Sequence, residues 1–413
     1  MEVDQQARAL SGIRVLDLTQ VMAGAYCSAL LADMGADVVK IERPGAGDDT
    51  RRMGGVTDPE AAPGFIALNR NKRGLAVDLK TPAGVELVRR LAADADVLVE
   101  NYRPGALQRL GLGFDDLASI NPRLVYCSIS GFGTTGPYSD RGGFDLVAQG
   151  MSGLMSMTGE PDGAPVKAGV PVCDLNAGIF GAVGVLNALM YRERFGRGQH
   201  VDVSLLEAGI ATTVWETANW FAAGDVATPL GSAHRMSAPY QAFPTADGWL
   251  TIGAANQRTW EKLCSAIGRT DLTEDPRFVD NPTRLRNREA LAKEIATTLA
   301  TDTRAGWSQK LHAAGVPCGP INSIDEVYRD EHVLSREMAV RVDHPGLGPV
   351  THIGQPYKLS HSPSRITRTA PLLGEHSTEV LAESGWSDEE IEHLLDAGVI
   401  TVPHRAPEGS AAT

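Results

Sequence analysis

The sequence predicts an α/β protein in which a parallel β-sheet is followed by a smaller α+β domain. Over the first 130 residues, strand-like apolar segments alternate with helix-like segments of about 10–15 residues, the pattern of βαβ units with right-handed crossovers. The chain has 413 residues, enough for two or three domains. Its composition, 43% hydrophobic and 22% charged, is that of an ordinary folded protein and excludes disorder over most of the chain.

The elements of the first part follow from local pattern. Continuous apolar runs such as IRVLDL are typical of buried strands, and Gly35 marks a helix end. Strands are therefore expected at residues 13–18, 38–42, 97–100 and 124–130, and helices at residues 23–34 and 82–93.

A long helix is expected at residues 174–195, with glycines at positions 178, 181 and 184. Glycine lowers helix propensity, so three glycines at this spacing indicate that another backbone packs closely against the helix. A short strand at residues 200–203 and a helix at residues 205–222 should follow.

The character of the chain changes after about residue 230. Two strand-like segments flank Ala246-Asp247-Gly248, which indicates a hairpin over residues 240–253. Helices are then expected at residues 260–267, 286–300 and 304–314, strands at 338–343 and 350–353, and two C-terminal helices, the second opening with the capping box Ser387-Asp388-Glu389-Glu390.

These changes predict three parts of the chain. Residues 1–222 form the first part of a large domain, residues 223–335 a small α+β domain with its linkers, and residues 336–413 a return to the large domain with the C-terminal helices.

Charge and cysteine usage narrow the class of protein. A net charge of −13 argues against a general nucleic-acid binder but allows a local basic pocket for a small anion. The five cysteines are far apart and form no C-x-x-C pair, which favours reduced thiols and no metal site. The N-terminus has no apolar signal region, and the apolar stretch at residues 177–191 is short for a membrane span. We expect a soluble cytoplasmic protein with no membrane partner.

Several common motifs are absent from the sequence. A dinucleotide site needs G-x-G-x-x-G after the first strand, where Gly24 is the one glycine. There is no P-loop, no G-x-S-x-G and no H-E-x-x-H. These absences disfavour NTPase, hydrolase and zinc-enzyme functions.

Cations gather near the expected carboxyl ends of the strands, where open α/β sheets bind ligands. Arg43 follows the second strand and Arg103 follows the strand at residues 97–100. In an acidic chain, such a group indicates a polyphosphate ligand, although each cation alone could be a solvated surface residue. Further cations close in sequence are Lys72, Arg73, Lys80 and Arg109.

Two other positions could carry chemistry. Asp174 stands just before the glycine-bearing helix, where it could cap the helix, act as an ionised nucleophile toward an activated acyl group, or do both. His234 and Arg235 lie in a Gly/Ser/Ala loop before the small domain. That loop could be a lid or an acid-binding edge, or an ordinary surface loop.

Taken together, these residues resemble the class III CoA-transferases, the formyl-CoA-transferase-like or CaiB/BaiF family. The resemblance runs from about residue 10 to about residue 400. It rests on the stretches LSGIRVLDLTQVMAG, GADVVKIERPGAGDDTR, NRNKRGLAVDLKTPAG, ADVLVENYRPGALQRLG, NPRLVYCSISGFG, FDLVAQGMSG, GRGQHVDVSLLEA and APLLGEH.

The resemblance implies a fold and a ligand. The fold is a Rossmann-like large domain formed by both chain ends, with a small domain between them, and two such subunits interlock as a homodimer. Coenzyme A or acyl-CoA is a substrate, and no cofactor or metal is permanently bound. The implied CoA-binding positions are Val21, Arg43, Val77, Lys80, Asn101, Tyr102 and Arg109.

The implied mechanism is covalent. Asp174 attacks the donor thioester to give a mixed anhydride, and the released CoA thiolate converts it into an aspartyl-CoA thioester. The acceptor carboxylate then attacks, a second anhydride forms, and CoA returns to the acceptor.

The sequence departs from formyl-CoA transferases at two places. Residues 231–240 replace their glycine-rich loop, and Met22 stands where a glutamine is common. These departures disfavour oxalate and formate and favour dicarboxylates or other larger acids. The candidate substrate-binding residues are Met22, Phe144, His234 and Arg235.

Three other functions stay open at this point. A 2-methylacyl-CoA racemase of the same superfamily needs a histidine in a Gly-His-Asp segment, where this chain has Gly143-Phe144-Asp145, and phenylalanine cannot move a proton. A nicotinamide oxidoreductase rests on fold analogy alone. A CoA-binding protein without catalysis is the third.

Overall fold

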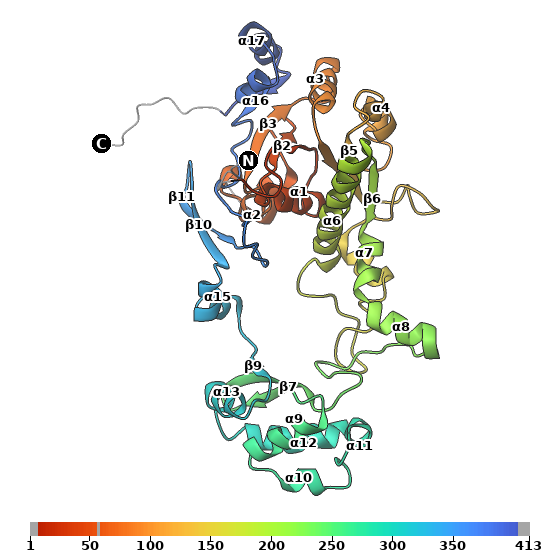
Figure 1. Cartoon of the computed structure of the whole chain (residues 1–413), viewed down its shortest axis with the longest axis vertical. Helices are drawn as coiled ribbons and strands as arrows, with labels where there is room; N and C mark the ends of the chain where they lie inside the picture. Colours follow the sequence, from red (N-terminus) through yellow and green to blue (C-terminus); the bar gives the residue numbers. More distant parts are fainter. Residues whose placement is uncertain (1–6, 56–57, 404–413) are drawn as a thin grey trace, which may run out of the picture. The chain divides into compact units, whose positions relative to one another are not determined.

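A computed structural model describes residues 7–55 and 58–403 of the chain. The chain forms two compact units (Figure 1). Unit 1 comprises Met1–Leu154, Ala168–Thr217 and His332–Thr413, and unit 2 comprises Met155–Lys167 and Ala218–Glu331. The domain limits expected after residues 222 and 335 remain a prediction.

Unit 1 is built on a seven-stranded sheet. All neighbouring strands pair in parallel except β12, which pairs antiparallel with β3 at one edge. The predicted α/β class with a mostly parallel sheet is confirmed, and both chain ends contribute to it. The spatial order is β12 (Ile400–Thr401), β3 (Lys72–Val77), β2 (Asp37–Glu42), β1 (Arg14–Asp17), β4 (Val97–Glu100), β5 (Val125–Ser130) and β6 (His200–Ser204).

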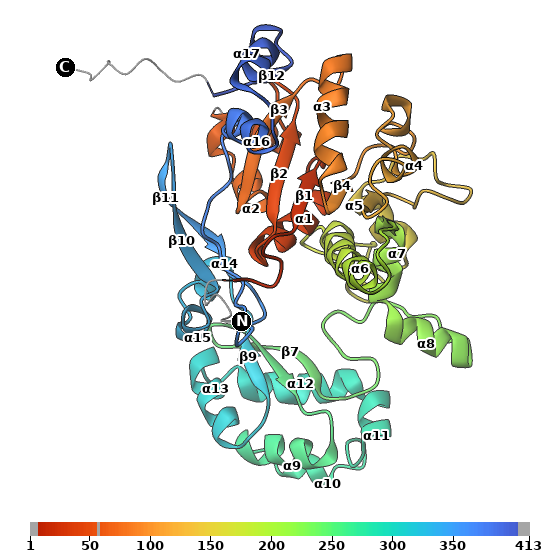
Figure 2. The same cartoon turned by 45° about the horizontal axis from the view of Figure 1, so that its top comes forward.

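Alternate residues of each strand face opposite sides of the sheet, and apolar residues occur on both faces. Helices therefore cover both faces of the sheet (Figure 2). Val15 packs with α1 (Ala23–Asp33) and α6 (Val172–Phe195) in one core cluster, whereas Leu16 belongs to a second cluster with α3 (Pro82–Ala93). The C-terminal helices α16 (Ser377–Glu383) and α17 (Asp388–Asp396) pack in that second cluster, and Ser387 and Glu390 form the expected capping box.

Close packing of α6 explains its glycines. A Cβ atom on Gly178 would lie 2.7 Å from the Ala23 carbonyl oxygen of α1, and one on Gly184 would lie 2.6 Å from Val201 of β6. The expectation that another backbone approaches this helix is confirmed. By length and composition α6 could cross a membrane, but its buried residues fill the core between α1 and the sheet.

The strand β3 is one of the elements that were not predicted from the sequence. It begins with Lys72 and Arg73, two cations that break the apolar pattern, and both are buried. Lys72 Nζ lies 2.8 Å from Asp17 Oδ2, and Arg73 pairs with Asp37 of β2 at 2.6 Å. The interpretation of these two cations as phosphate ligands is therefore wrong, because both are buried and form ion pairs with carboxylates of the fold.

The other elements of unit 1 are short. The two strands that the sequence predicts at residues 338–343 and 350–353 are β10 (Ala339–His344) and β11 (Gly348–Ile353), and they pair antiparallel. The helix expected at residues 205–222 is divided at Thr213 into two helices. The remaining helices are α2 (Pro63–Leu68), α4 (Phe114–Ala118), α5 (Asp145–Met151), α7 (Leu205–Thr212), α8 (Val214–Ala223), which continues into unit 2, and the 3₁₀ turns Asp49–Gly55, Pro59–Ala61 and Gln108–Leu110.

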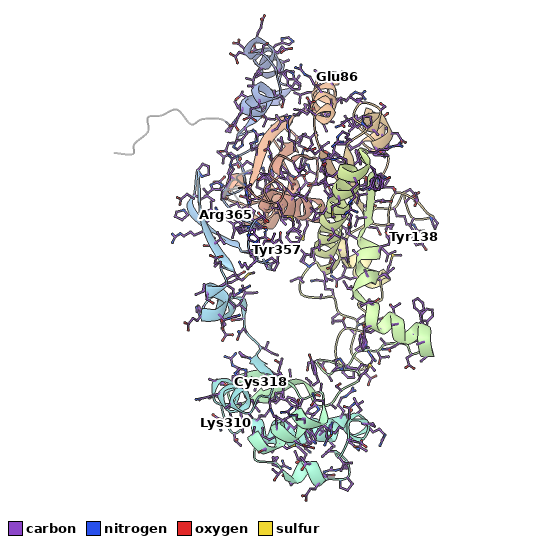
Figure 3. All side chains as sticks on the ribbon, in the orientation of Figure 1. Glu86, Tyr138, Lys310, Cys318, Tyr357 and Arg365 are labelled. Carbon is purple, nitrogen blue, oxygen red and sulfur yellow. The ribbon has the colours of Figure 1, made fainter. Side chains whose placement is uncertain are left out.

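Unit 2 packs helices on a three-stranded antiparallel sheet around Trp260 and Phe243. Its sheet consists of β7 (Tyr240–Thr245), β8 (Gly248–Gly253) and β9 (Cys318–Pro320), so the expected hairpin is confirmed. Lys310 and Cys318 mark this unit in Figure 3. Its helices are α9 (Gln257–Ala266), α10 (Asp271–Glu274), α11 (Asn281–Arg286), α12 (Arg288–Leu299), α13 (Arg304–Ala313) and α14 (Ile324–Val327), and α15 (Glu331–Ser335) leads into unit 1.

Replacing Lys72 by alanine should destabilise unit 1 strongly, because the buried Asp17 carboxylate then loses its ion pair with Lys72. Removing one partner of a buried ion pair costs about 3–5 kcal/mol. The exposed Lys80 supplies the control, since Lys80→Ala should change the free energy of unfolding by less than about 0.5 kcal/mol. Urea denaturation followed by circular dichroism measures both, and equal stabilities would contradict the structural role of Lys72.

Candidate active site

A cavity of about 260 Å³ opens at the carboxyl edge of the sheet in unit 1. The strand order reverses between β1 and β4, and open α/β sheets bind ligands at such a reversal. The cavity is lined by residues that follow β1, β4 and β5 and by the first turns of α5, α6 and α7, namely Gln20, Val21, Met22, Ala23, Asn101, Tyr102, Arg103, Pro104, Ile129, Ser130, Gly131, Arg141, Gly142, Gly143, Phe144, Asp145, Asp174 and Leu205.

Asp174 is the third residue of α6, and Pro171 occupies the N-cap position. The interpretation of Asp174 as the helix cap is therefore wrong, because the helix begins two residues earlier than expected. In the described part of the chain, no group donates a hydrogen bond to its carboxylate or forms an ion pair with it. Burial, and then the nearby charge of Asp145, raises the pKa of Asp174 to about 6, against the effect of the helix dipole.

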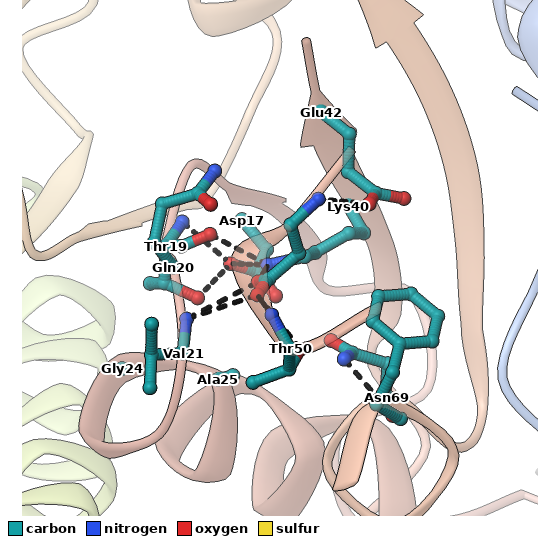
Figure 4. A network of polar contacts seen from close by, with 12 residues as sticks. Asp17, Thr19, Gln20, Val21, Gly24, Ala25, Lys40, Glu42, Thr50 and Asn69 are labelled. Carbon is teal, nitrogen blue, oxygen red and sulfur yellow. Dashed lines mark hydrogen bonds and ion pairs between the residues drawn. The ribbon is translucent and has the colours of Figure 1, made fainter. Parts of the chain in front are cut away.

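The loop between β1 and α1 adopts a strained conformation at the edge of this cavity. Val21 has a φ of 63°, a region that β-branched residues rarely enter. Its N–H donates to both oxygens of Asp48 at 3.2 Å, and Asp48 in turn pairs with the buried Lys40 at 2.8 Å and accepts from Thr50 (Figure 4). This buried network holds Met22 at the N-cap of α1, with no side-chain hydrogen bond to the first turn.

Asn101 joins the two loops on either side of the reversal. Its side-chain oxygen accepts from the N–H of Gln20 and its amide donates to the carbonyl of Gln20, both at 2.7 Å. Tyr102 follows, and its backbone N–H donates to Glu100 at 2.8 Å. Hydrogen bonds between side chains and backbone groups thus fix both residues in the positions from which they line the cavity.

A loop after β5 forms another part of the wall. Tyr138, labelled in Figure 3, lies in this loop, and the Arg141 guanidinium stacks on its ring at 3.7 Å. The Phe144 side chain is 77% exposed and lines the cavity from the residue before α5.

Four predicted CoA-binding residues do not line this cavity. Arg43 is exposed and pairs with Asp49, with its Nε donating to the Gly47 carbonyl at 3.0 Å. The Val77 side chain is buried in the core, so only its backbone could meet a ligand. Lys80 and Arg109 are exposed.

Sequence comparison decides the family. A profile of CoA-transferase family III matches residues 10–377. The chain belongs to CoA-transferase family III.

Relatives and solved structures agree with this assignment. Succinyl-CoA:glutarate CoA-transferase of Mus musculus is 41% identical over 392 residues, which cover 95% of this chain and 90% of the relative. Succinate–glutarate CoA-transferase of Agrobacterium fabrum is 41% identical over 381 residues, covering 91% of this chain and 95% of the relative. The crystal structure of a CaiB/BaiF family protein from Brucella suis has a TM-score of 0.83 at 38% identity and covers 92% of this chain and 100% of that chain. The predicted family and the enzyme class, CoA-transferase, are confirmed.

In this CoA-transferase the other two candidate substrate residues lie in unit 2. His234 Nδ1 accepts from the N–H of Met236, and Arg235 donates to the Thr228 carbonyl at 2.7 Å. Arg288 of α12 lies beside Arg235, and burial, followed by the like charge of Arg235, lowers the pKa of Arg288. Within the described residues, neither arginine forms an ion pair, and the Nε atom of each is buried without a hydrogen-bond partner.

Three residues of these sites, Asp145, Arg141 and Arg288, were not predicted from the sequence. Asp145 stands in the Gly143-Phe144-Asp145 segment, which was analysed only for the missing histidine. Arg141 and Arg288 carry no motif. No group of three metal-ligating side chains occurs among the described residues.

The raised pKa of Asp174 makes this carboxylate a source of instability. Since its pKa in the folded protein is about 6, above the ordinary value of 3.8, folding loses free energy as the pH rises from about 4 to about 6. The free energy of unfolding of Asp174→Asn should therefore exceed that of the wild type by roughly 1 kcal/mol at pH 7.5. At pH 4 the two free energies should be equal. Urea unfolding at both pH values measures this, with the exposed Asp388→Asn as control; a difference that does not depend on pH would contradict it.

Proposed function

We propose that this enzyme transfers CoA between an acyl-CoA and a dicarboxylic acid through covalent intermediates on Asp174. The observation that carries the proposal is a carboxylate with no hydrogen-bond donor or cation partner among the described residues, in the wall of the cavity at the strand-order reversal. The names of the relatives support the substrate class, since they include succinyl-CoA:glutarate and succinyl-CoA:mesaconate CoA-transferases.

The reaction balances as four acyl transfers. The Asp174 carboxylate attacks the thioester carbonyl, the C–S bond breaks, and CoA leaves as the thiolate. The thiolate attacks the aspartyl carbonyl of the anhydride and expels the donor carboxylate. The acceptor carboxylate then displaces CoA from the aspartyl thioester, and CoA finally attacks the acceptor carbonyl and regenerates Asp174.

The chain's residues supply binding and charge for these steps. An ionised, unpaired carboxylate needs no general base, so the reaction proceeds without proton transfer. Arg103 and Arg141 line the cavity with Asp174 and are suited to the negative charge that each transition state carries. We propose that CoA binds along Val21, Asn101 and Tyr102 in the cavity and, outside it, at the Val77 backbone and at Arg43, Lys80 and Arg109.

Covalent transfer is tested by hydroxylamine trapping. Incubation with succinyl-CoA and hydroxylamine should convert Asp174 into the hydroxamate, because the activated aspartyl carboxyl reacts with this nucleophile. Peptide mass spectrometry should find the mass change on the peptide that holds Asp174, and Asp174→Ala should lose both this change and CoA transfer.

The racemase alternative gives the opposite result. It requires no covalent adduct, and it would incorporate deuterium at the α-carbon of a 2-methylacyl-CoA in deuterated water. Phe144 at the position of the proton-transferring histidine disfavours it. Deuterium exchange without hydroxamate would overturn the transferase mechanism.

We propose that Arg235 and Arg288 of unit 2 form a site for a carboxylate of the dicarboxylic acid. Two neighbouring guanidinium groups without a carboxylate partner in the described chain, each with a buried, unpaired Nε, need an anion to compensate them. Met22 and Phe144 are proposed to contact substrate in the cavity of unit 1, and His234 is proposed to contact substrate in unit 2, next to Arg235.

Arg235→Met should raise the KM for glutarate by about tenfold or more, because a charged hydrogen bond is worth about 1.5–3 kcal/mol. The KM for pentanoate, which lacks the second carboxylate, should not change. Steady-state kinetics with both acceptors measures this ratio, and Arg258→Met, an exposed arginine of α9, is the control. An equal rise for both acids would contradict selection by charge.

We also propose that the enzyme is cytoplasmic and, as the family resemblance implies, a homodimer. Exposed apolar side chains on α6 and at the start of α8 support a second copy as the partner, because exposed apolar patches on a folded protein mark interaction sites. These side chains are Ile179, Phe180, Val183, Met190, Tyr191, Phe195, Val214 and Trp215.

A further inference from the structure

Asp145 makes an unusual connection between two helices of unit 1. It is the first residue of α5, and its Oδ1 accepts hydrogen bonds from the backbone N–H groups of Cys173 at 2.9 Å and Asp174 at 3.3 Å. These are the second and third residues of α6, whose own N-cap, Pro171, has no side chain to cap them. Asp145 is therefore a cap for α6 that comes from another helix. One of the N–H groups that it caps belongs to Asp174, the proposed nucleophile.

Gln149 holds the carboxylate of Asp145 in place. It lies one turn later on α5 and is completely buried, and its Nε2 donates to Asp145 Oδ2 at 2.6 Å. Its Oε1 accepts from the N–H of Ala168 at 2.9 Å, in the segment that leads into α6. A buried amide with both ends bonded is a rigid support, so Asp145 has little freedom to turn away.

The charge of Asp145 faces that of Asp174 in the same cavity. The charged side chains that line this cavity are Arg103, Arg141, Asp145 and Asp174, and Cys173 next to Asp174 is a neutral thiol because burial raises its pKa to about 11. Asp145 is the charged group whose effect on the Asp174 pKa is resolved, and it disfavours the ionised form. Two carboxylates in one site repel each other while both are ionised.

We propose that Asp145 is a positioning residue for the covalent reaction: it fixes the Asp174 backbone through the first turn of α6, and its charge destabilises the free Asp174 carboxylate relative to the acylated one. Acylation turns Asp174 into a neutral anhydride or thioester, so the repulsion exists before the attack and is absent after it. This inference rests on the proposed covalent role of Asp174 and adds the residue that drives its acylation.

Two substitutions separate the charge from the hydrogen bonds. Asp145→Asn keeps an oxygen that can accept from α6 but removes the charge and the acceptor of the Gln149 hydrogen bond, whereas Asp145→Glu keeps the charge. With Asp145→Asn, kcat for CoA transfer should fall about tenfold with little change in KM, and the acidic limb of the kcat–pH profile should move about one unit lower. With Asp145→Glu, the acidic limb should stay at the wild-type position.

Hydroxylamine trapping distinguishes a failure of the proposed covalent function from a failure of the proposed role of Asp145. A wild-type enzyme that gives no hydroxamate on Asp174 would overturn the proposed function itself. A wild-type enzyme that gives it, with Asp145→Asn keeping the wild-type kcat and acidic limb, would overturn only the role of Asp145. An equal shift of the limb in the Asn and Glu variants would also overturn it, since a structural change alone would then explain both. Asp388→Asn, in the first turn of α17, is the control and should leave every quantity unchanged.

Discussion

Two completely buried lysines connect the strands of unit 1 to the loop that forms its cavity. Lys72 of β3 donates to Asp17 of β1, and Lys40 of β2 donates to Asp48, which holds the Val21 backbone. Burial alone would raise the pKa of Asp17, yet the two lysines hold it well below its usual value, whereas burial lowers the pKa of Lys72 to about 8. The strained loop at the edge of the cavity therefore depends on this network, and Figure 4 shows its part around Asp17, Lys40 and Val21.

The opposite arrangement occurs at Asp174, a half-buried carboxylate for which the described chain supplies no cation or hydrogen-bond donor. The same fold that pairs Asp17 with two lysines leaves this group next to Asp145. Such a site costs stability and is retained where the reaction needs a reactive group. The contrast between a satisfied and an unsatisfied carboxylate is the physical basis for assigning structure to one and chemistry to the other.

The success of prediction differs between elements for identifiable reasons. β4 and α3 were predicted with their observed bounds, since Val97–Glu100 is wholly apolar up to its last residue and Pro82 marks a helix start. β3 was missed because Lys72 and Arg73 are compensated by residues distant in sequence, such as Glu383. Asp174 was found as a candidate, but Asp145, 29 residues away in the chain, was not, because its role depends on the packing of α5 against α6.

The sequence by itself determined the α/β class, the family and the candidate nucleophile, because periodicity, turn residues and motif spacing are local properties of the chain. Only the tertiary structure decided which charges are buried and which are free. Lys72 and Lys80 look alike in sequence, and one lies in a buried ion pair while the other is exposed. Burial and pairing are set by neighbours that folding brings from distant positions, and these neighbours determine whether a charged residue stabilises the fold or remains available to a ligand.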